Sequence, residues 1–245
     1  TFYHISSESV LNIRVYINPD KGVSVMVRCQ CKGEVLDLSP SKIICLLRNY
    51  AAHATEMKNE IPDRVRFFLK PPSSLLEEGG EIVIPEGVEV LHHEVELALL
   101  IGKDGFRISG FQALDHVKAF GLMLDITARD IQDEAKRKGL PWSEAKGYDT
   151  FAPVGRTFVN PDDYDPRNKR IWLSVNDEIR QDGNTDLMLF KPQTIISEIS
   201  KVMSLETGDL ILTGTPAGVG KLVHGDIVKV GIEGIGETEF KVIKR

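Results

Sequence analysis

The stretch His92-His93-Glu94-Val95-Glu96-Leu97-Ala98 lies inside a longer run, residues 91–103, that has the composition of a β-strand. Because side chains alternate between the two faces of a strand, a spacing of two places Glu94, Glu96 and Ala98 on the same face. Two neighbouring carboxylates on a largely apolar strand repel each other and lose hydration, and a bound divalent cation would offset both costs. The alternative is the solvent-facing polar side of an ordinary antiparallel sheet, and this stretch alone leaves both open.

Asp125 stands at the end of a second apolar run, residues 117–124, which predicts a buried strand. Its alternative role is to cap the helix predicted over residues 127–138. Together with Glu94 and Glu96, Asp125 would complete a site made only of oxygen ligands. Such a site suits Mg²⁺ or Mn²⁺, and Ca²⁺ is expected only as a substitute in crystals.

Three polar residues of the predicted helix, Arg129, Gln132 and Lys136, share one face because they are three and seven positions apart. Arg129 and Gln132 lie in the first turns, nearest to the predicted metal site. The alternative for both is a solvated helix face. Lys146 follows in what reads as a flexible connection after Trp142, where a lysine is usually a surface residue.

The segment from Arg48 to Glu56 supplies a candidate general base. His53 and Glu56 are three residues apart, so in a helical turn the carboxylate reaches the imidazole and raises its basicity. The alternative is an exposed helical turn with no special role. Residues 57–63 are mostly polar and contain Pro62, which suits a lid over a site.

Composition excludes several classes of protein. The chain has 245 residues, 42% of them apolar, and a net charge of −6, which gives no support to nucleic-acid binding. It lacks an apolar run long enough to span a membrane and a recognisable secretory signal. The three cysteines suggest a reducing, cytoplasmic location, and the pair Cys29 and Cys31 lacks the further ligands that a zinc site needs.

Strand-like segments outnumber helical ones along the chain, which predicts an α+β, β-rich fold. Residues 1–41 read as a small N-terminal β-rich domain and residues 42–245 as the main domain. Asn176-Asp177 is a signal for a two-residue hairpin turn, and residues 194–203 predict an amphipathic helix.

The glycine-rich stretch of residues 213–220 resembles a phosphate-binding loop only superficially. Thr215 stands where that motif needs glycine, and Leu222 follows Lys221 where it needs serine or threonine. A loop at a strand end fits better, and its backbone amides and the Thr215 hydroxyl would hold a substrate carboxylate.

Seven segments, in order and with matching spacing, resemble the fumarylacetoacetate hydrolase family over the chain from about Lys42 onward. They are Arg48-Asn49-Tyr50-Ala51-x-His53, Phe68-Leu69-Lys70-Pro71, His92-His93-Glu94-x-Glu96-Leu97, Leu124-Asp125-x-Thr127-Ala128-Arg129-Asp130-x-Gln132-Asp133, Lys138-Gly139-Leu140-Pro141-Trp142, Ala145-Lys146-Gly147 and Leu212-Thr213-Gly214-Thr215-Pro216. The similarity is greatest to the subgroup of acylpyruvases and oxaloacetate decarboxylases. One departure is Leu47, where many members have glycine.

The resemblance implies a mixed β-sandwich roll and a homodimer. It implies that Mg²⁺ or Mn²⁺ binds to Glu94, Glu96 and Asp125, and that His53 and Glu56 form a catalytic dyad on a lid. Lys146 is expected to take part in catalysis. Substrate contacts are expected from Arg48, Lys70, Arg129, Gln132 and Thr215.

The expected activity is the metal-dependent cleavage of a carbon–carbon bond in a small α-keto acid. The substrate would be an acylpyruvate, which is hydrolysed, or oxaloacetate, which is decarboxylated, and both reactions pass through a pyruvate enolate. The alternative is an isomerase of the 2-hydroxyhepta-2,4-diene-1,7-dioate type, since the same ligands would serve it equally well.

Overall fold

The computed structural model describes residues 15–18, 22–57 and 60–244, with side chains described from residue 26 onward. The predicted N-terminal domain, residues 1–41, therefore lies partly outside the described residues. No helix in the described part of the chain is both long and apolar enough to cross a membrane.

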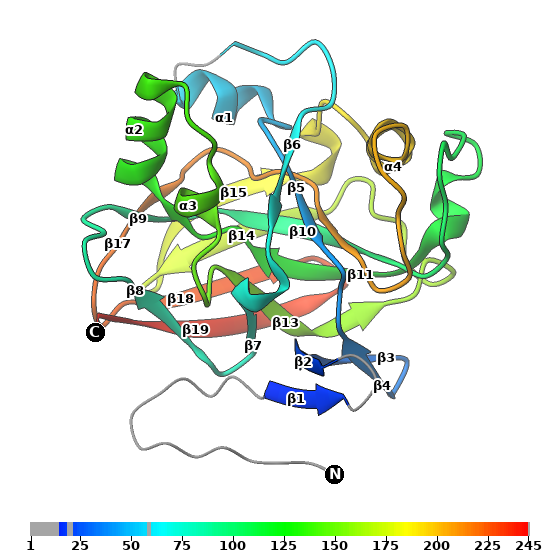
Figure 1. Cartoon of the computed structure of the whole chain (residues 1–245), viewed down its shortest axis with the longest axis horizontal. Coiled ribbons are helices and arrows are strands. Elements are labelled where there is room, and N and C mark those ends of the chain that lie inside the picture. Colours follow the sequence, from blue (N-terminus) through cyan, green and yellow to red (C-terminus); the bar gives the residue numbers. More distant parts are fainter. Residues whose placement is uncertain (1–14, 19–21, 58–59, 245) are drawn as a thin grey trace.

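The largest sheet is mixed and has nine strands (Figure 1). Its order is β4 (Glu34–Leu38), β3 (Val27–Cys31), β13 (Ala152–Val159), β11 (Val117–Leu124), β10 (Val95–Ile101), β16 (Leu210–Leu212), β5 (Ile43–Leu46) and β6 (Phe67–Lys70), and β7 (Leu75–Glu77) also pairs with β13. β10 and β11 are antiparallel, whereas β16 and β5 are parallel. β10 and β11 are therefore internal strands of this sheet. The predicted ligands Glu94, Glu96 and Asp125 lie where β10 begins and β11 ends.

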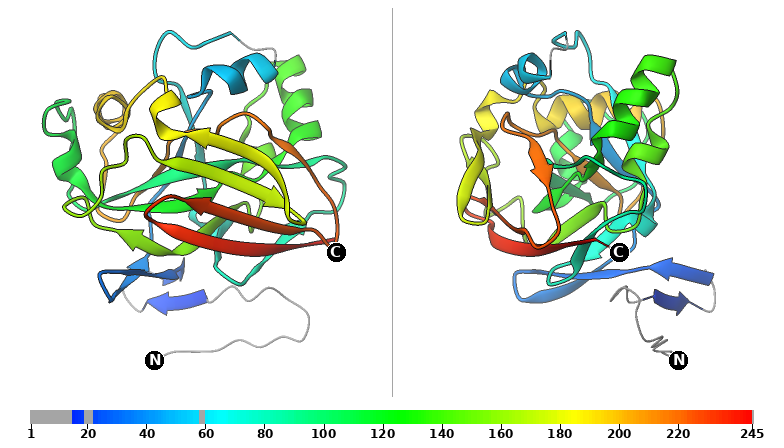
Figure 2. Two further views of the ribbon diagram at one scale, coloured as in Figure 1. Left: turned by 180° about the vertical axis from the view of Figure 1, so that it is seen from behind. Right: turned by 90° about the vertical axis from the view of Figure 1, so that its left-hand side faces the viewer.

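A second large sheet packs against the first (Figure 2). Its order is β15 (Glu178–Asn184), β14 (Arg170–Val175), β18 (Ile227–Ile232), β19 (Gly236–Lys244) and β8 (Glu81–Ile84). A small sheet contains β12 (Thr127–Ala128), β9 (Leu91–His93) and β17 (Gly220–Leu222), and β1 (Val15–Asn18) pairs with β2 (Gly22–Val25). The curled, strand-rich arrangement confirms the predicted α+β fold.

Alternation along β10 divides its side chains between two hydrophobic cores. Leu97 and Leu99 belong to the core that also contains Leu173 of the second sheet. Ala98 and Leu100 belong to the core on the opposite face. Glu96, which is two residues before Ala98, therefore lies on the same face of β10 as Ala98, as predicted.

In the part of the chain that the structure describes, four α-helices lie outside the sheets: α1 (Ala51–Glu56), α2 (Arg129–Lys138), α3 (Ser143–Lys146) and α4 (Pro192–Ser200). In Figure 1, α1, α2 and α3 gather at one end of the nine-stranded sheet. α2 ends at Gly139, whose φ of 66° is the left-handed conformation that closes many helices. The hairpin prediction at Asn176 and Asp177 is confirmed, because both residues have positive φ.

Three predicted boundaries were wrong. Residues 91–103 are not one strand, because at Glu94 the chain passes from the small sheet to the large one. The helix predicted from residue 127 begins at Arg129, since Thr127 and Ala128 pair with β9. The helix predicted over residues 194–203 runs from Pro192 to Ser200, and proline is favoured in the first helical turn.

The β3–β4 hairpin extends the large sheet, because β3 pairs in parallel with β13. Cys29 and Cys31 lie on one face of β3, and both are buried free thiols. The division of the chain into residues 1–41 and residues 42–245 remains a prediction.

Candidate active site

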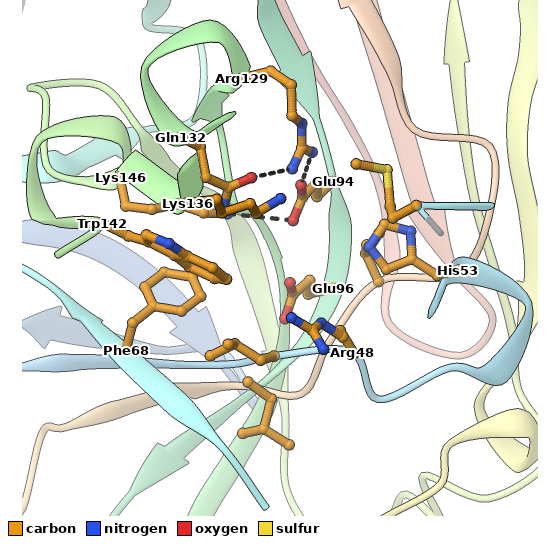
Figure 3. Close-up of a pocket in the computed structure, with 14 residues that line it drawn as sticks. Arg48, His53, Phe68, Glu94, Glu96, Arg129, Gln132, Lys136, Trp142 and Lys146 are labelled. Carbon is orange, nitrogen blue, oxygen red and sulfur yellow. Dashed lines mark hydrogen bonds and ion pairs between the residues drawn. The ribbon is translucent and has the colours of Figure 1, made fainter. Parts of the chain in front are cut away.

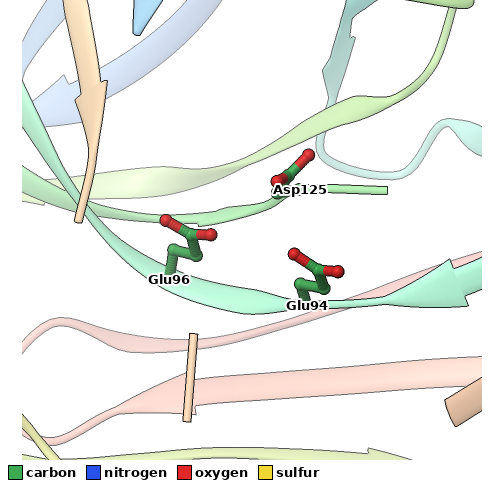
Figure 4. Close-up of side chains that lie close together, drawn as sticks. All are labelled: Glu94, Glu96 and Asp125. Atoms are coloured by element: carbon green, nitrogen blue, oxygen red, sulfur yellow. The ribbon is translucent and has the colours of Figure 1, made fainter. Parts of the chain in front are cut away.

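Glu94, Glu96 and Asp125 converge at the junction of β9, β10 and β11 (Figure 4). One carboxylate oxygen from each lies within 4.8 Å of the others. The three residues are at most 5% exposed, so the alternative of a solvent-facing polar surface is wrong. The capping role considered for Asp125 is also wrong, because Ala128 occupies the N-cap position of α2 and no side chain caps that helix.

Asp125 is held by two buried lysines. Lys146 Nζ donates to Asp125 Oδ2 at 2.6 Å, and Lys70 Nζ lies 2.8 Å from Asp125 Oδ1. The Lys70 ammonium donates its three protons to the backbone carbonyls of Ile126, Lys146 and Phe151, at 2.8–2.9 Å. Asp125 Oδ1 therefore accepts no hydrogen bond and keeps its lone pairs available.

Glu94 is surrounded by donors. Arg129 Nη2 forms an ion pair with Glu94 Oε1, the Thr127 hydroxyl donates to the same oxygen, and Lys146 Nζ lies 3.4 Å from Glu94 Oε2. Burial opposes ionisation of this carboxyl, but Lys146 and Arg129 outweigh it and lower the pKa of Glu94 below its usual range. Glu94 is thus held as a carboxylate.

The surroundings of Glu96 disfavour a negative charge, in contrast to those of Glu94. Its Oε2 accepts a hydrogen bond of 2.5 Å from the backbone N–H of Gly214. Burial, followed by the charges of Asp125 and Glu94, raises the pKa of Glu96 well above its usual range. Lys146 opposes this shift of the pKa without reversing it, and among the described residues no cation forms an ion pair with Glu96.

His53 and Glu56 form the predicted pair on α1. His53 Nδ1 lies 3.3 Å from Glu56 Oε2, and the imidazole is buried, so the alternative of an exposed turn is wrong for His53. The backbone N–H of Gly218 donates to both Glu56 oxygens. The predicted lid, residues 57–63, includes residues 58–59, which lie outside the described residues.

A pocket joins these two groups (Figure 3). It encloses about 430 Å³ with its open mouth included. It is lined by Leu46, Leu47, Arg48, His53, Met57, Phe68, Glu94, Glu96, Arg129, Gln132, Lys136, Trp142, Lys146 and Thr215. The pocket thus places an imidazole opposite a carboxylate cluster, with an apolar wall beside them.

Most of the predicted substrate contacts line this pocket, but Lys70 does not. Lys70 lies behind Asp125 with its protons already donated, so the structure does not place it in contact with a substrate. Lys146 is not a surface residue in a flexible connection, because it ends the short helix α3 and is 2% exposed. Its two buried carboxylate partners explain why a lysine is stable there.

Gln181 is an organising residue that the sequence did not indicate. This fully buried side chain on β15 accepts hydrogen bonds from the Val95 N–H and binds His93, and it donates to Thr215 Oγ1 at 2.7 Å. Because the Thr215 oxygen is used as an acceptor, its hydroxyl proton points elsewhere. A polar residue on an otherwise exposed, polar strand gives no signal in the sequence.

Asn49 has a similar role at the base of α1. Its side chain donates to the carbonyls of Thr213 and Phe190 and accepts from the Phe190 N–H. Gly214 has φ +95° and lies so close that a Cβ there would be 2.6 Å from Asn49 Cβ. These contacts fix the start of α1 against the loop that carries Thr215.

The fold and the site together define a class of protein: a β-sandwich roll with a buried acidic cluster at a pocket that also contains a His–Glu pair. Residues 42–243 match the family model described as fumarylacetoacetate hydrolase C-terminal. The chain therefore belongs to the fumarylacetoacetate hydrolase family.

Several relatives have names that describe an activity. The chain is 47% identical over 205 residues to the mitochondrial oxaloacetate tautomerase FAHD1 of Arabidopsis thaliana, covering 84% of this chain and 92% of the relative. It is 48% identical over 206 residues to the mitochondrial oxaloacetate decarboxylase of Dictyostelium discoideum, covering 83% and 94%.

Several solved structures share the fold, among them a hydrolase and an isomerase. Fumarylpyruvate hydrolase from Pseudomonas aeruginosa, in complex with Mn²⁺ and pyruvate, has a TM-score of 0.85 and 32% identity, covering 91% of this chain and 97% of that one. The 2-hydroxyhepta-2,4-diene-1,7-dioate isomerase of Mycobacterium marinum has a TM-score of 0.75 and 33% identity, covering 95% and 87%.

Proposed function

We propose that this protein is a metal-dependent enzyme that breaks a carbon–carbon bond in small α-keto acids, by hydrolysis of acylpyruvates, by decarboxylation of oxaloacetate, or by both. The observation that carries the proposal is the buried cluster of Glu94, Glu96 and Asp125, two of whose members, Glu94 and Glu96, line one pocket together with His53. The names of the relatives and of the Pseudomonas structure support the choice of substrate class.

The residues present fit a hard divalent cation. Their donor atoms are all carboxylate oxygens. Among the described residues Asp125 Oδ1 has no hydrogen-bond partner, and burial and the neighbouring carboxylates disfavour the charge of Glu96. We propose Glu94, Glu96 and Asp125 as ligands of Mg²⁺ or Mn²⁺. When bound, the ion would supply positive charge to the oxygens of the α-keto acid.

The side chains around the cluster would hold the substrate. Thr215 has a hydroxyl proton to donate, since its oxygen already accepts from Gln181. Arg129 is oriented by Gln132 and Glu94, and keeps further N–H groups for a carboxylate. Lys70 would act as a positioning residue for Asp125 rather than as a substrate contact.

His53 would act as the general base. For an acylpyruvate it takes a proton from water, and the water oxygen attacks the distal carbonyl carbon. The bond between that carbon and C3 of the pyruvate part then breaks, and its electron pair stays with C3, which is protonated to give pyruvate. Glu56 supports the imidazolium that forms, and Lys146 supplies further positive charge beside the cluster.

The second candidate is an isomerase of 2-hydroxy-diene dioates, which the Mycobacterium structure favours. Pyruvate release separates the two. With oxaloacetate and acetylpyruvate as substrates, Mg²⁺- or Mn²⁺-dependent release that EDTA abolishes supports bond cleavage. Absence of release from both substrates would overturn that proposal and favour the isomerase, to be tested with a hydroxy-diene dioate.

We also expect a homodimer and a cytoplasmic location, and these two expectations need separate tests. Light scattering after size-exclusion chromatography measures the mass of the assembly. Cell fractionation is needed for the location, because the two named relatives are described as mitochondrial.

A further inference from the structure

Gln181 reaches the interior because strand β15 is irregular. Leu173 of β14 pairs with Gln181, and the next residue of β14 pairs with Ile179. Arg180 is therefore an extra residue on β15, and a bulge of this kind redirects the side chains beside it. β15, which the structure describes in full, has one buried residue, and it is Gln181. The bulge thus accompanies the burial of a carboxamide.

The partners of Gln181 fix the orientation of its carboxamide. The Val95 N–H can only donate, so the atom 3.2 Å away must be the oxygen, Oε1. The Pro216 carbonyl can only accept, so the atom 2.8 Å away must be the nitrogen, Nε2. It follows that His93 Nδ1, 3.0 Å from Oε1, carries a proton. It also follows that Thr215 Oγ1, 2.7 Å from Nε2, accepts a hydrogen bond.

All the hydrogen-bonding groups of this carboxamide are used. An amide oxygen has two lone pairs and an amide nitrogen has two N–H groups, and Gln181 has two partners at each. Turning the carboxamide over would place donor against donor at Val95 and acceptor against acceptor at Pro216. Such contacts are costly in a region shielded from water. Gln181 therefore has one stable orientation.

Thr215 connects this carboxamide to the pocket, which it lines. Its oxygen accepts from Gln181, so its proton cannot point toward that residue. In the part of the chain that the structure describes, the hydroxyl donates to no acceptor, and Thr215 is 3% exposed. A shielded donor is stabilised when it meets an acceptor. A carboxylate, which accepts hydrogen bonds and donates none, is a suitable partner.

We propose that Gln181 is a positioning residue for the substrate, because its carboxamide holds the Thr215 hydroxyl as a hydrogen-bond donor to the carboxylate of the α-keto acid group. The inference rests on the proposed function and adds to it a residue that does not line the pocket. Gln181 also binds the Val95 N–H, between Glu94 and Glu96, and so keeps the hydroxyl at a fixed place relative to the acidic cluster.

Gln181→Glu tests the direction of the hydroxyl. Glutamate has nearly the same shape and keeps an oxygen for the Val95 N–H, but an ionised glutamate has no N–H to donate to Thr215. The hydroxyl would then donate to the new carboxylate and be lost to the substrate. KM for oxaloacetate or acetylpyruvate should rise at least about 10-fold, and kcat should change less than about 3-fold, because a hydrogen bond to a charged group of the substrate is lost.

A double variant separates this effect from a change of charge or of structure. Thr215→Val removes the hydroxyl and should by itself raise KM about 10-fold. In that background Gln181→Glu should add less than about 3-fold, because the group through which it acts is absent. Gln30→Glu is the matched control, since this exposed residue lies on β3, and it should leave both KM and kcat unchanged.

An undiminished effect of Gln181→Glu in the Thr215→Val protein, or an unchanged KM in the single variant, would overturn the proposal. If Gln181→Glu did not fold, Gln181→Met would replace it in the same cycle. Methionine frees the hydroxyl instead of reversing it, so the loss should be smaller but should again disappear with Thr215→Val.

The proposed function fails separately, if the wild-type protein releases pyruvate from neither substrate. Calorimetry with Mn²⁺ and pyruvate then decides the role of Gln181 alone, since pyruvate has the same α-keto acid group. The wild type should bind pyruvate at least about 10-fold more tightly than Gln181→Glu does. Equal binding by the two proteins, or no binding by the wild type, would overturn the inference.

Discussion

The backbone N–H of Gly218 donates to both carboxylate oxygens of Glu56, at 3.0 and 3.1 Å. These residues are far apart in the chain, and the contact joins α1 to the loop that carries Thr215. Glu56 contacts His53 while it is itself held by the loop that carries Thr215. Hydrogen bonds therefore connect the candidate base His53, through Glu56, to the loop that carries the candidate substrate contact Thr215.

Gly218→Ala should break the hydrogen bonds between this loop and Glu56. Gly218 has φ +99°, and a Cβ there would lie 1.9 Å from the Arg180 carbonyl oxygen, so the loop must move. We expect a loss of about 2 kcal/mol or more in the free energy of unfolding and a fall in turnover.

Gly225→Ala is the matched control. Gly225 has φ +94°, but a Cβ there would meet nothing within 4 Å. This variant should cost only the backbone strain, about 1 kcal/mol, and keep full turnover. Denaturant unfolding and kinetics on both variants check the prediction, and equal behaviour of the two would contradict it.

His53→Ala should reduce acylpyruvate hydrolysis by about 10²-fold or more, because the pocket would lose its general base. Glu56→Gln should have a smaller effect, since the imidazole remains. Mn²⁺ affinity, measured by calorimetry, should stay unchanged in both variants. Near-normal turnover in His53→Ala would remove this residue from the mechanism.

Glu94→Ala should abolish Mn²⁺ binding, because it removes one of three carboxylates that lie within 4.8 Å of one another. Calorimetry of the metal-free protein measures the loss directly. Glu86→Ala, at an exposed position outside the cluster, should bind Mn²⁺ like the wild type. Unchanged affinity in Glu94→Ala would contradict the ligand assignment.

Lys70→Met should destabilise the protein by about 3–5 kcal/mol, since it leaves the buried Asp125 carboxylate without one of its two cations. A bound divalent ion would compensate part of that charge. The loss in melting temperature should therefore be larger in EDTA than with Mn²⁺. An equal loss under both conditions would argue against a metal at Asp125.

Local spacing was enough to predict the pairs that lie close together in the chain. Glu94 and Glu96 share a region of the site because strand side chains alternate, and His53 reaches Glu56 because a helical turn brings them together. The fold class followed from the number of strand-like segments. That the carboxylates bind a metal and that His53 is a base remain predictions.

Contacts between distant segments could not be predicted in this way. Lys146 looked like a surface residue because its partners, Glu94 and Asp125, are on other elements. Gln181 gave no signal, since its contacts with His93 and Thr215 depend on how two sheets pack. The break at Glu94 was missed because a change of sheet leaves no mark in an apolar run.

The buried ion pairs also have a consequence for charge balance. With Glu96 ionised, Glu94, Glu96 and Asp125 carry three negative charges, and Lys70, Lys146 and Arg129 carry three positive ones. A divalent cation would leave two positive charges unmatched in a region shielded from water. A substrate with one carboxylate cancels one of them, and oxaloacetate, with two carboxylates, cancels both. The charge of the centre would thus favour an anionic substrate over water before any bond is broken.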